Sequence, residues 1–239
     1  MKDSISKIFI WTTFALFIGN TALFARDFRI NQFPHGTTVG CGGCHVSPYG
    51  GGTLTPYGTE VRDSFLIGSG QVNWVPDLAF ADSDGDGFSN GHELEDPFGM
   101  WSTGTDNPGN PEFVTNPGSA SEIPTGDAAK FSLHMNITQM GAHSGQYFEL
   151  LLVDYSTNSV VASESLDSIV DHDFEYIFMH TLEAGGSYYV DMWTDHNANG
   201  VYDPPPTDHS WRVVLSNVAE NISNDFQHTI NFDDISGTV

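Results

Sequence analysis

The pattern of hydrophobic and polar positions changes near residue 125. Beyond it, apolar and polar residues alternate in short segments bounded by turn-forming residues. A period of two is typical of strands with one buried face. The predicted strands are Phe131–Ile137, Gln146–Tyr155, Val160–Leu166, Asp173–Leu182, Ser187–Thr194, His209–Val218 and Asn224–Phe232. This series predicts a seven-stranded Ig-like or transthyretin-like β-sandwich over residues 127–235.

Residues 26–122 show no sustained periodicity and are rich in Gly, Pro, Asn and Asp. Short helices are predicted around Tyr57–Phe65 and Asn90–Leu94, and residues 120–127 form a linker. A loop-rich domain has little secondary structure to hold it, so we expect covalent or metal braces. The predicted fold class is therefore mainly β, with a small loop-rich N-terminal domain followed by the sandwich.

The first 25 residues have the pattern of an export signal. Lys2 and Lys7 precede a mostly apolar run from Ile8 to Ile18, and Ala25 offers a small residue before a cleavage point. An apolar run of about 11 residues is too short to span a bilayer, which takes about 20. We predict a signal peptide at residues 1–25, no membrane span, and a secreted, periplasmic or cell-surface location.

Charge narrows the possible functions. The 239 residues include 31 Asp and Glu against 7 Lys and Arg, a formal net charge of −24. Such a surface repels phosphate backbones and disfavours nucleic-acid binding, whereas it suits divalent cations and basic partners. The sequence also has no Gly-x-Ser-x-Gly elbow, phosphate-binding loop with lysine or His-Glu-x-x-His helix, so we predict no enzymatic activity.

The strongest chemical motif is Cys41-Gly42-Gly43-Cys44-His45. This Cys-x-x-Cys-His spacing is typical of c-type haem attachment, with both thiols in thioethers and His45 as an axial iron ligand. Cys41 and Cys44 are the only cysteines, and a disulfide between them is the main alternative, followed by a metal site or free thiols. Ordinary small cytochromes c carry the motif at a helix end, whereas here it stands among glycines.

The second axial ligand of such a haem has several candidates. His35 stands six residues before Cys41 and is the first choice. Met100 and His92 are the others, and an open or water-bound site is a further option. A methionine would give a higher reduction potential than a second histidine.

An acidic stretch fits the calcium loop of EF-hand proteins. Carboxylates occupy positions 1, 3, 5 and 12, a glycine allows the turn at position 6, a backbone carbonyl serves at position 7, and an amide acts through water at position 9. The predicted ligands are Asp82, Asp84, Asp86, Phe88, Asn90 and Glu93. Because Pro76 interrupts the preceding segment, a long helix is not expected there, and we predict a single structural calcium.

A second, weaker candidate lies between two predicted strands. Its oxygen ligands would be Asp195, Asn197, Asn199 and Asp203, with Gly200 at position 6. Position 12 lacks a glutamate, although Asp208 can fold back; a polar hairpin loop is the alternative. The remaining histidines have no compelling metal-binding spacing and are expected on polar faces: His134, His143, His172, His180, His196, His209 and His228.

Residues 27–118 resemble the temptin family of secreted proteins, a small domain first known from a water-borne protein pheromone. The matching segments are Gly50–Gly58, Trp74, Asp82–Glu93, Leu94–Pro97, Trp101 and Asn116–Gly118. The resemblance implies an extracellular domain with a calcium loop and a disulfide, which strengthens the disulfide alternative for Cys41 and Cys44. The chain departs from the family pattern because it has no cysteine near Asp77 or Pro97.

Two functional hypotheses follow. The first is an exported c-type haem protein for electron transfer or redox sensing, with structural calcium and a redox partner protein. The alternative is a non-enzymatic secreted recognition or adhesion module with a Cys41–Cys44 disulfide and structural calcium, in which the sandwich binds an extracellular partner.

Overall fold

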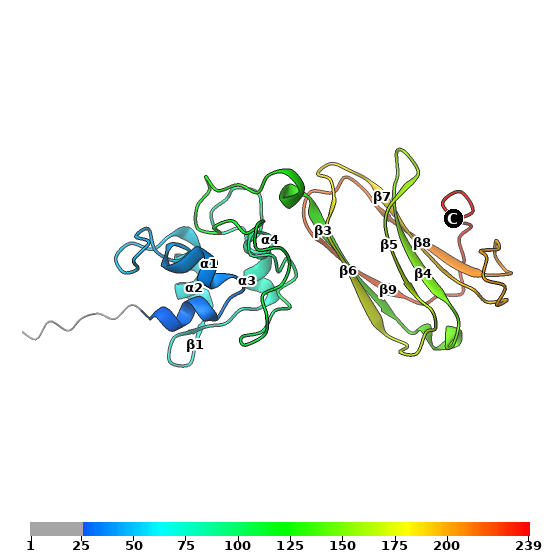
Figure 1. Cartoon of the computed structure of the whole chain (residues 1–239), viewed down its shortest axis with the longest axis horizontal. Helices are drawn as coiled ribbons and strands as arrows, with labels where there is room; N and C mark the ends of the chain where they lie inside the picture. The colour runs from blue at the N-terminus through cyan, green and yellow to red at the C-terminus, as the bar shows by residue number, and fades with distance from the viewer. Residues whose placement is uncertain (1–25) are drawn as a thin grey trace, which may run out of the picture.

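The computed structural model describes residues 26–239 and arranges them as two domains lying end to end (Figure 1). The predicted signal peptide lies outside the described residues. Across the described chain the fold is mainly β, with nine strands in three sheets and a few short helices. Among residues 26–239, no helix has the length and apolarity needed to cross a membrane.

The N-terminal domain consists of short elements joined by loops. They are η1 (Asp27–Asn31), α1 (Gly36–Val39), η2 (Gly40–Gly42), α2 (Pro56–Ser64), the hairpin β1 (Leu66–Ile67) and β2 (Gln71–Val72), α3 (Pro76–Phe80) and α4 (Asn90–Glu93). The helices α2 and α4 confirm the two predicted helices to within a residue. Pro76 does not prevent a helix but begins one, because proline at the first helical position loses no intrahelical hydrogen bond.

Several residues that carry the temptin resemblance hold this domain together. Tyr57 and Leu94 are buried in its core. The indole nitrogen of Trp74 donates to the buried Asp96 carboxylate at 2.7 Å, and that same carboxylate accepts the backbone N–H of Trp101 at 2.9 Å. Asp96 therefore holds the segment 96–101 in a closed turn, and its bond to Trp74 links this segment to the domain core.

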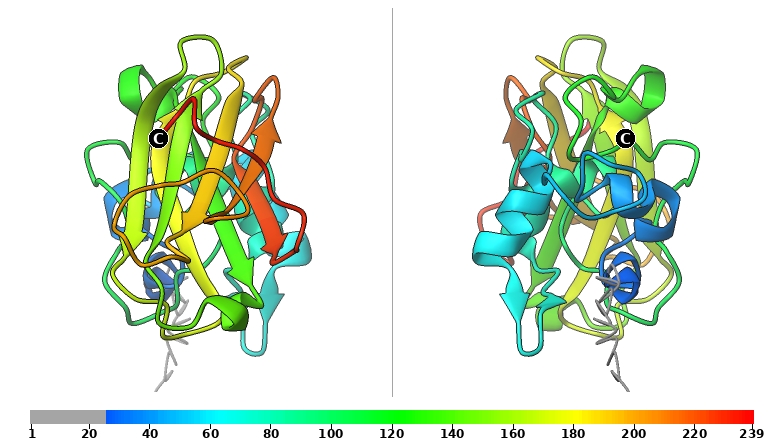
Figure 2. Two further views of the ribbon diagram at one scale, coloured as in Figure 1. Left: turned by 90° about the vertical axis from the view of Figure 1, so that its right-hand side faces the viewer. Right: turned by 90° about the vertical axis from the view of Figure 1, so that its left-hand side faces the viewer.

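The C-terminal domain is a sandwich of two sheets. After η3 (Gly126–Ala129) come β3 (Phe131–Thr138), η4 (Met140–His143), β4 (Phe148–Asp154), β5 (Ser159–Leu166), β6 (Phe174–Leu182), β7 (Tyr188–Thr194), β8 (His209–Leu215) and β9 (Ile222–Gln227). One sheet has the order β6-β3-β9 and the other β5-β4-β7-β8. Figure 2 shows the sandwich along the long axis of the molecule.

The seven predicted strands are all present. The alternation of apolar and polar residues that predicted them reflects the alternation of buried and solvent-facing positions in the sandwich. In β3, for example, Leu133, Met135 and Ile137 are fully buried between the sheets. The last strand was predicted too far along the chain: β9 ends at Gln227. The strand order also differs from the Ig arrangement, since β3 pairs with β6 and, in parallel, with β9. The Ig-like assignment is not confirmed, and the transthyretin-like one stays a prediction.

The two domains meet at the acidic loop. His92 of α4 is buried and contacts Ala128 O at 2.7 Å and Asn221 Oδ1 at 3.3 Å. The ring of Phe88, in the loop itself, packs 5.8 Å from that of Phe131. Across the same boundary, Glu95 pairs with His180 at 2.9 Å. The acidic loop is therefore built into the domain interface.

Candidate functional site

The Cys-x-x-Cys-His motif folds as a helical turn. It follows α1 directly, its first residues form η2, and the backbone N–H of His45 donates to Cys41 O at 2.9 Å. Although it stands among glycines, the motif therefore directly follows a short helix. Residues three apart in a helical turn project from the same side, so Cys41 and Cys44 share one face.

That face borders a cavity of about 500 Å³, within the range of about 300–1,000 Å³ typical of small-molecule and cofactor sites. Both cysteines and His45 line it, together with apolar side chains and the backbone of the glycine run. The apolar members are Ile30, Phe33, Leu54 and Val61, and the glycines are Gly50, Gly51 and Gly52. All three glycines have positive φ, which lets the backbone turn along the cavity wall.

The cavity also gathers positive charge. Arg26, Arg29 and Arg62 line it, which is three of the seven basic residues in the whole chain. Backbone carbonyls fix two of them: Arg26 donates to Ser69 O at 2.6 Å and Arg29 to Gly70 O at 2.8 Å. Burial, together with the charge of Arg26, lowers the pKa of Arg29. An apolar pocket with clustered arginines, in a protein this acidic, suits a ligand that is both apolar and anionic.

The Cys44 thiol at this cavity is not in its reactive, ionised form. Burial raises the pKa of Cys44 to about 11, so the thiol is neutral at physiological pH, unlike the thiolates of catalytic Cys-x-x-Cys motifs. Both cysteines are free. The Nδ1 atom of His45 is buried and has no hydrogen-bond partner. The motif thus presents two free cysteines and an incompletely paired imidazole to a pocket.

The predicted distal ligands lie elsewhere. His35 is buried, with its Nε2 atom 2.7 Å from Pro108 O and its backbone N–H bonded to Asn107, and it does not line the cavity. Met100 is about half exposed beside a different pocket, and His92 is at the domain interface. The structure therefore does not bring His35, Met100 or His92 to the motif.

Helix α2 packs behind the motif and is joined to it by the residue that precedes the helix, which the sequence did not assign to the site. Buried Thr55 caps α2: its Oγ1 accepts the N–H of Gly58 at 3.0 Å and donates to Gly43 O at 2.6 Å. The Thr55 N–H also donates to Cys44 O at 3.1 Å. One side chain therefore joins the start of α2 to the motif.

Thr55→Ala is expected to destabilise the N-terminal domain by about 1–2 kcal/mol, because it removes a helix cap and leaves the buried Gly43 carbonyl without its donor. Chemical denaturation followed by circular dichroism measures the loss. Thr59→Ala, which changes the same residue type inside α2 without removing the cap, is the control. Equal stability of Thr55→Ala and the unchanged protein would show that the cap is unimportant.

The first acidic loop has the geometry of a cation site. Asp82, Asp84 and Asp86 bring carboxylate oxygens within 4.8 Å of one another. Each also accepts loop N–H groups: Asp82 from Gly85 and Gly87, Asp84 from Asp86, and Asp86 from Phe88. These hydrogen bonds curve the loop backbone around the three carboxylates, which agrees with the turn predicted at the loop glycine.

Three carboxylate oxygens in this loop are buried without any hydrogen-bond partner: Asp84 Oδ2, Asp86 Oδ2 and Glu93 Oε2. The other Glu93 oxygen accepts Thr115 Oγ1 at 3.0 Å. Burial and the three aspartates raise the pKa of Glu93 to about 9. Buried, unpaired carboxylates repel one another, and a bound divalent cation would remove that penalty.

The other two predicted ligands of this loop also have structural roles. The Asn90 side chain is fully buried, donating to Leu78 O at 2.8 Å and accepting the Ser83 N–H at 3.3 Å. Phe88 packs its ring against His92 and Phe131. Ser83 Oγ also bonds Glu60 of α2, which connects this loop to the helix behind the Cys-x-x-Cys-His motif.

The second predicted loop, between β7 and β8, is closed by hydrogen bonds among its own side chains. Asp195 accepts the N–H groups of Asn199 and Gly200, and Asp203 accepts the side-chain amides of Asn197 and Asn199 at 2.8 Å. Asp208 folds back, fully buried, to accept three loop N–H groups, as anticipated. Its acidic groups do not converge as those of the first loop do, and calcium binding here stays a prediction.

Fold and site together define a two-domain protein: a small loop-rich domain with an acidic, cation-site-like loop and a cavity at a Cys-x-x-Cys-His turn, followed by a β-sandwich. Residues 24–119 match the family model described as Temptin C-terminal, so this part of the chain is similar to that domain, and we refer to it as the temptin-like domain. The chain is 39% identical over 74 residues to Temptin from Aplysia californica. That match covers 31% of this chain and 54% of that protein, so the chain spans about half the length of this relative. No solved structure matches the chain.

Proposed function

We propose that the protein is a secreted, non-enzymatic recognition protein whose temptin-like domain and sandwich engage an extracellular partner. The observation that carries this proposal is the match of residues 24–119 to the Temptin C-terminal model, together with the identity to Temptin. The resemblance to the temptin family implies an extracellular domain, which agrees with this function. The comparisons favour this function over electron transfer, and the predicted signal peptide is consistent with it.

In this function the acidic loops hold structural calcium. The ligands in the first loop are Asp82, Asp84, Asp86, the carbonyl of Phe88, Asn90 through water, and Glu93. The buried oxygens without partners support this set, because a cation is what would pair them. Calcium would then stiffen the domain interface at which Phe88 and His92 pack.

The cavity at the motif favours a second candidate, covalent binding of haem c. Cys41 and Cys44 would add to the two vinyl groups, and His45 would ligate the iron. Arg26 and Arg29 would face the propionates, which fits their position at the wall of an apolar cavity. Bound in this way, haem supplies one-electron chemistry, and the acidic surface would favour a basic redox partner.

One experiment separates the two functions. The full chain is produced in a host with haem-attachment machinery, and the exported product is analysed by visible absorption and intact mass. A secreted recognition protein gives a colourless product, with two hydrogens fewer if Cys41 and Cys44 form a disulfide. A Soret band and a mass gain of one haem would overturn this function in favour of haem binding.

A Cys41→Ser, Cys44→Ser variant completes the comparison. For a haem protein, this variant loses both the covalent mass gain and the colour that survives denaturation. For a disulfide-bonded recognition protein, it loses only the two-hydrogen difference and shows no spectral change.

A further inference from the structure

Four histidines from separate parts of the chain meet at the end of the sandwich opposite the N-terminal domain. Strands β3 and β9 run in parallel from the domain interface, and His143 and His228 lie just beyond their far ends. His196 follows β7 and His209 begins β8, at that same end. Sequence spacing gave no indication of this group, because it forms only through the strand order of both sheets.

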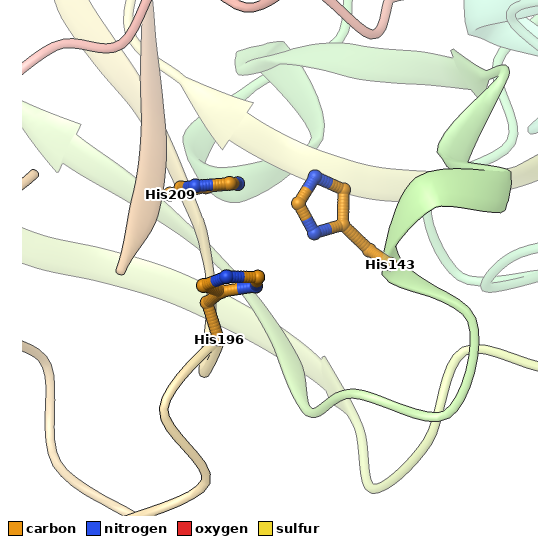
Figure 3. A group of neighbouring side chains, drawn as sticks. All are labelled: His143, His196 and His209. Atoms are coloured by element: carbon orange, nitrogen blue, oxygen red, sulfur yellow. The ribbon is translucent and has the colours of Figure 1, made fainter. Parts of the chain in front are cut away.

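Three of these side chains form a compact group (Figure 3). His143, His196 and His209 each offer a ring nitrogen, and the three nitrogens lie within 4.8 Å of one another. The rings of His196 and His209 are stacked, with centroids 4.4 Å apart, and the ring of His143 stands nearly perpendicular to that of His209 at 5.1 Å. A single metal ion placed between the edge of the His143 ring and the stacked pair would be within reach of all three side chains.

Neighbouring groups hold the rings as they do in metal sites. Gln146 bridges two of them, with Oε1 2.8 Å from Nδ1 of His143 and Nε2 3.1 Å from Nδ1 of His196. The Nε2 atom of His143 lies 3.0 Å from Nε2 of His228. Metal-ligating histidines typically use one ring nitrogen for the metal and the other for such a supporting contact. Both ring nitrogens of His143 have partners here, because Nδ1 also lies 3.2 Å from Thr194 Oγ1, so a bound metal would replace one of these contacts.

A second, independent observation points to a ligand. The Nδ1 atom of His209 is buried and has no hydrogen-bond partner. A buried ring nitrogen without a partner carries a desolvation cost, which a bound metal would remove.

We propose that His143, His196 and His209 bind a divalent transition metal of the Zn²⁺ type, with His228 and Gln146 as supporting partners. Imidazole nitrogens select zinc, copper and nickel over calcium, which prefers oxygen ligands. His143 is buried whereas His196 is exposed, so the site is open to solvent on one side. This site is separate from the temptin-like domain and goes beyond the proposed recognition function.

The β7–β8 loop positions the exposed ligand. The buried carboxylate of Asp208 accepts the backbone N–H of His196 at 2.9 Å, and His209 is the next residue. This contact brings two ligands that are thirteen residues apart into stacking distance. Asp208 is thus a positioning residue for the site.

The test is Zn²⁺ titration of the exported chain by calorimetry, in excess Ca²⁺, with long-range ¹H–¹⁵N NMR of the imidazoles. We expect one Zn²⁺ to bind with shifts confined to the four histidines. His196→Ala removes an exposed side chain, so the fold is retained. Loss of a group that only supports a metal ligand typically weakens metal affinity about 10- to 100-fold. Because His196 is itself a ligand, its loss should weaken Zn²⁺ binding at least this much.

His172→Ala is the matched control, because His172 is also exposed in the same domain and lies outside the group. It should leave Zn²⁺ affinity unchanged. Absence of Zn²⁺ binding, equal affinity in His196→Ala, or shifts at His45 in place of the sandwich histidines would each overturn the proposal. Loss of this site would leave the recognition function untouched.

Discussion

Chelating calcium is expected to destabilise the N-terminal domain strongly. Without a cation, Asp84, Asp86 and Glu93 each keep a buried oxygen unpaired, and the neighbouring aspartates disfavour a charge on Glu93. A ligand that binds only the folded state at 100 times its dissociation constant adds about 2.7 kcal/mol of stability. Thermal unfolding by calorimetry, with excess Ca²⁺ and then with a chelator, measures the difference.

The calcium-free protein should also respond to pH in a defined direction. The pKa of Glu93 is raised by burial and by the aspartates, from an ordinary value of 4.5 to about 9, so the folded state holds this proton more tightly than the unfolded chain. The stability it contributes is therefore fully present below pH 4.5 and is lost as pH rises toward 9. Saturating Ca²⁺ should abolish this loss, because the cation replaces the proton.

Glu93→Gln separates the cation effect from a general loss of packing. Near neutral pH the calcium-free protein must protonate Glu93 in order to bury it, whereas the glutamine amide is neutral at every pH. We therefore expect the calcium-free variant to be more stable than the calcium-free unchanged protein near neutral pH, with a much weaker response to Ca²⁺. Glu122→Gln, at an exposed carboxylate outside the loop, is the control. It should change neither the stability of the calcium-free protein nor the response to Ca²⁺. A Glu93→Gln protein with a full calcium response would contradict calcium binding at this loop.

The sequence predicts best what depends on local pattern. Alternation indicated all seven sandwich strands, although it placed the last one too far along the chain, because burial on one face repeats every second residue. The acidic loop was equally readable, since its carboxylates and turn glycine lie within twelve consecutive positions. Both features are encoded in short windows.

What the sequence did not predict depends on contacts between distant segments. Arg26 and Arg29 reach the motif cavity because carbonyls of the β1–β2 turn hold their side chains. His35 seemed close to the motif along the chain, yet its ring bonds Pro108, far away in sequence. The histidine group of the sandwich requires the strand order of two sheets. Contacts of this kind cannot be recognised from the spacing of residues along the sequence.

Gly58→Ala is expected to destabilise the N-terminal domain by about 3 kcal/mol, at the upper end of overpacking effects. A Cβ at this position would lie 2.0 Å from the carbonyl oxygen of Cys44, a backbone atom that cannot rotate away. Alanine normally stabilises a helix interior relative to glycine by about 0.5–1 kcal/mol, but this clash is larger and reverses the sign. Denaturation followed by circular dichroism measures the loss.

Gly42→Ala provides the matched control within the motif itself. A Cβ on Gly42 would find its nearest atom, in Pro48, at 4.0 Å, and the backbone there is not left-handed, so this variant should keep full stability. Because α2 must move for Gly58→Ala to fold, this variant should also lose whatever the cavity binds, whereas Gly42→Ala should not. Equal stability of the two variants would show that α2 does not pack directly on the motif, and would remove the structural basis for a cavity formed by the two cysteines and His45.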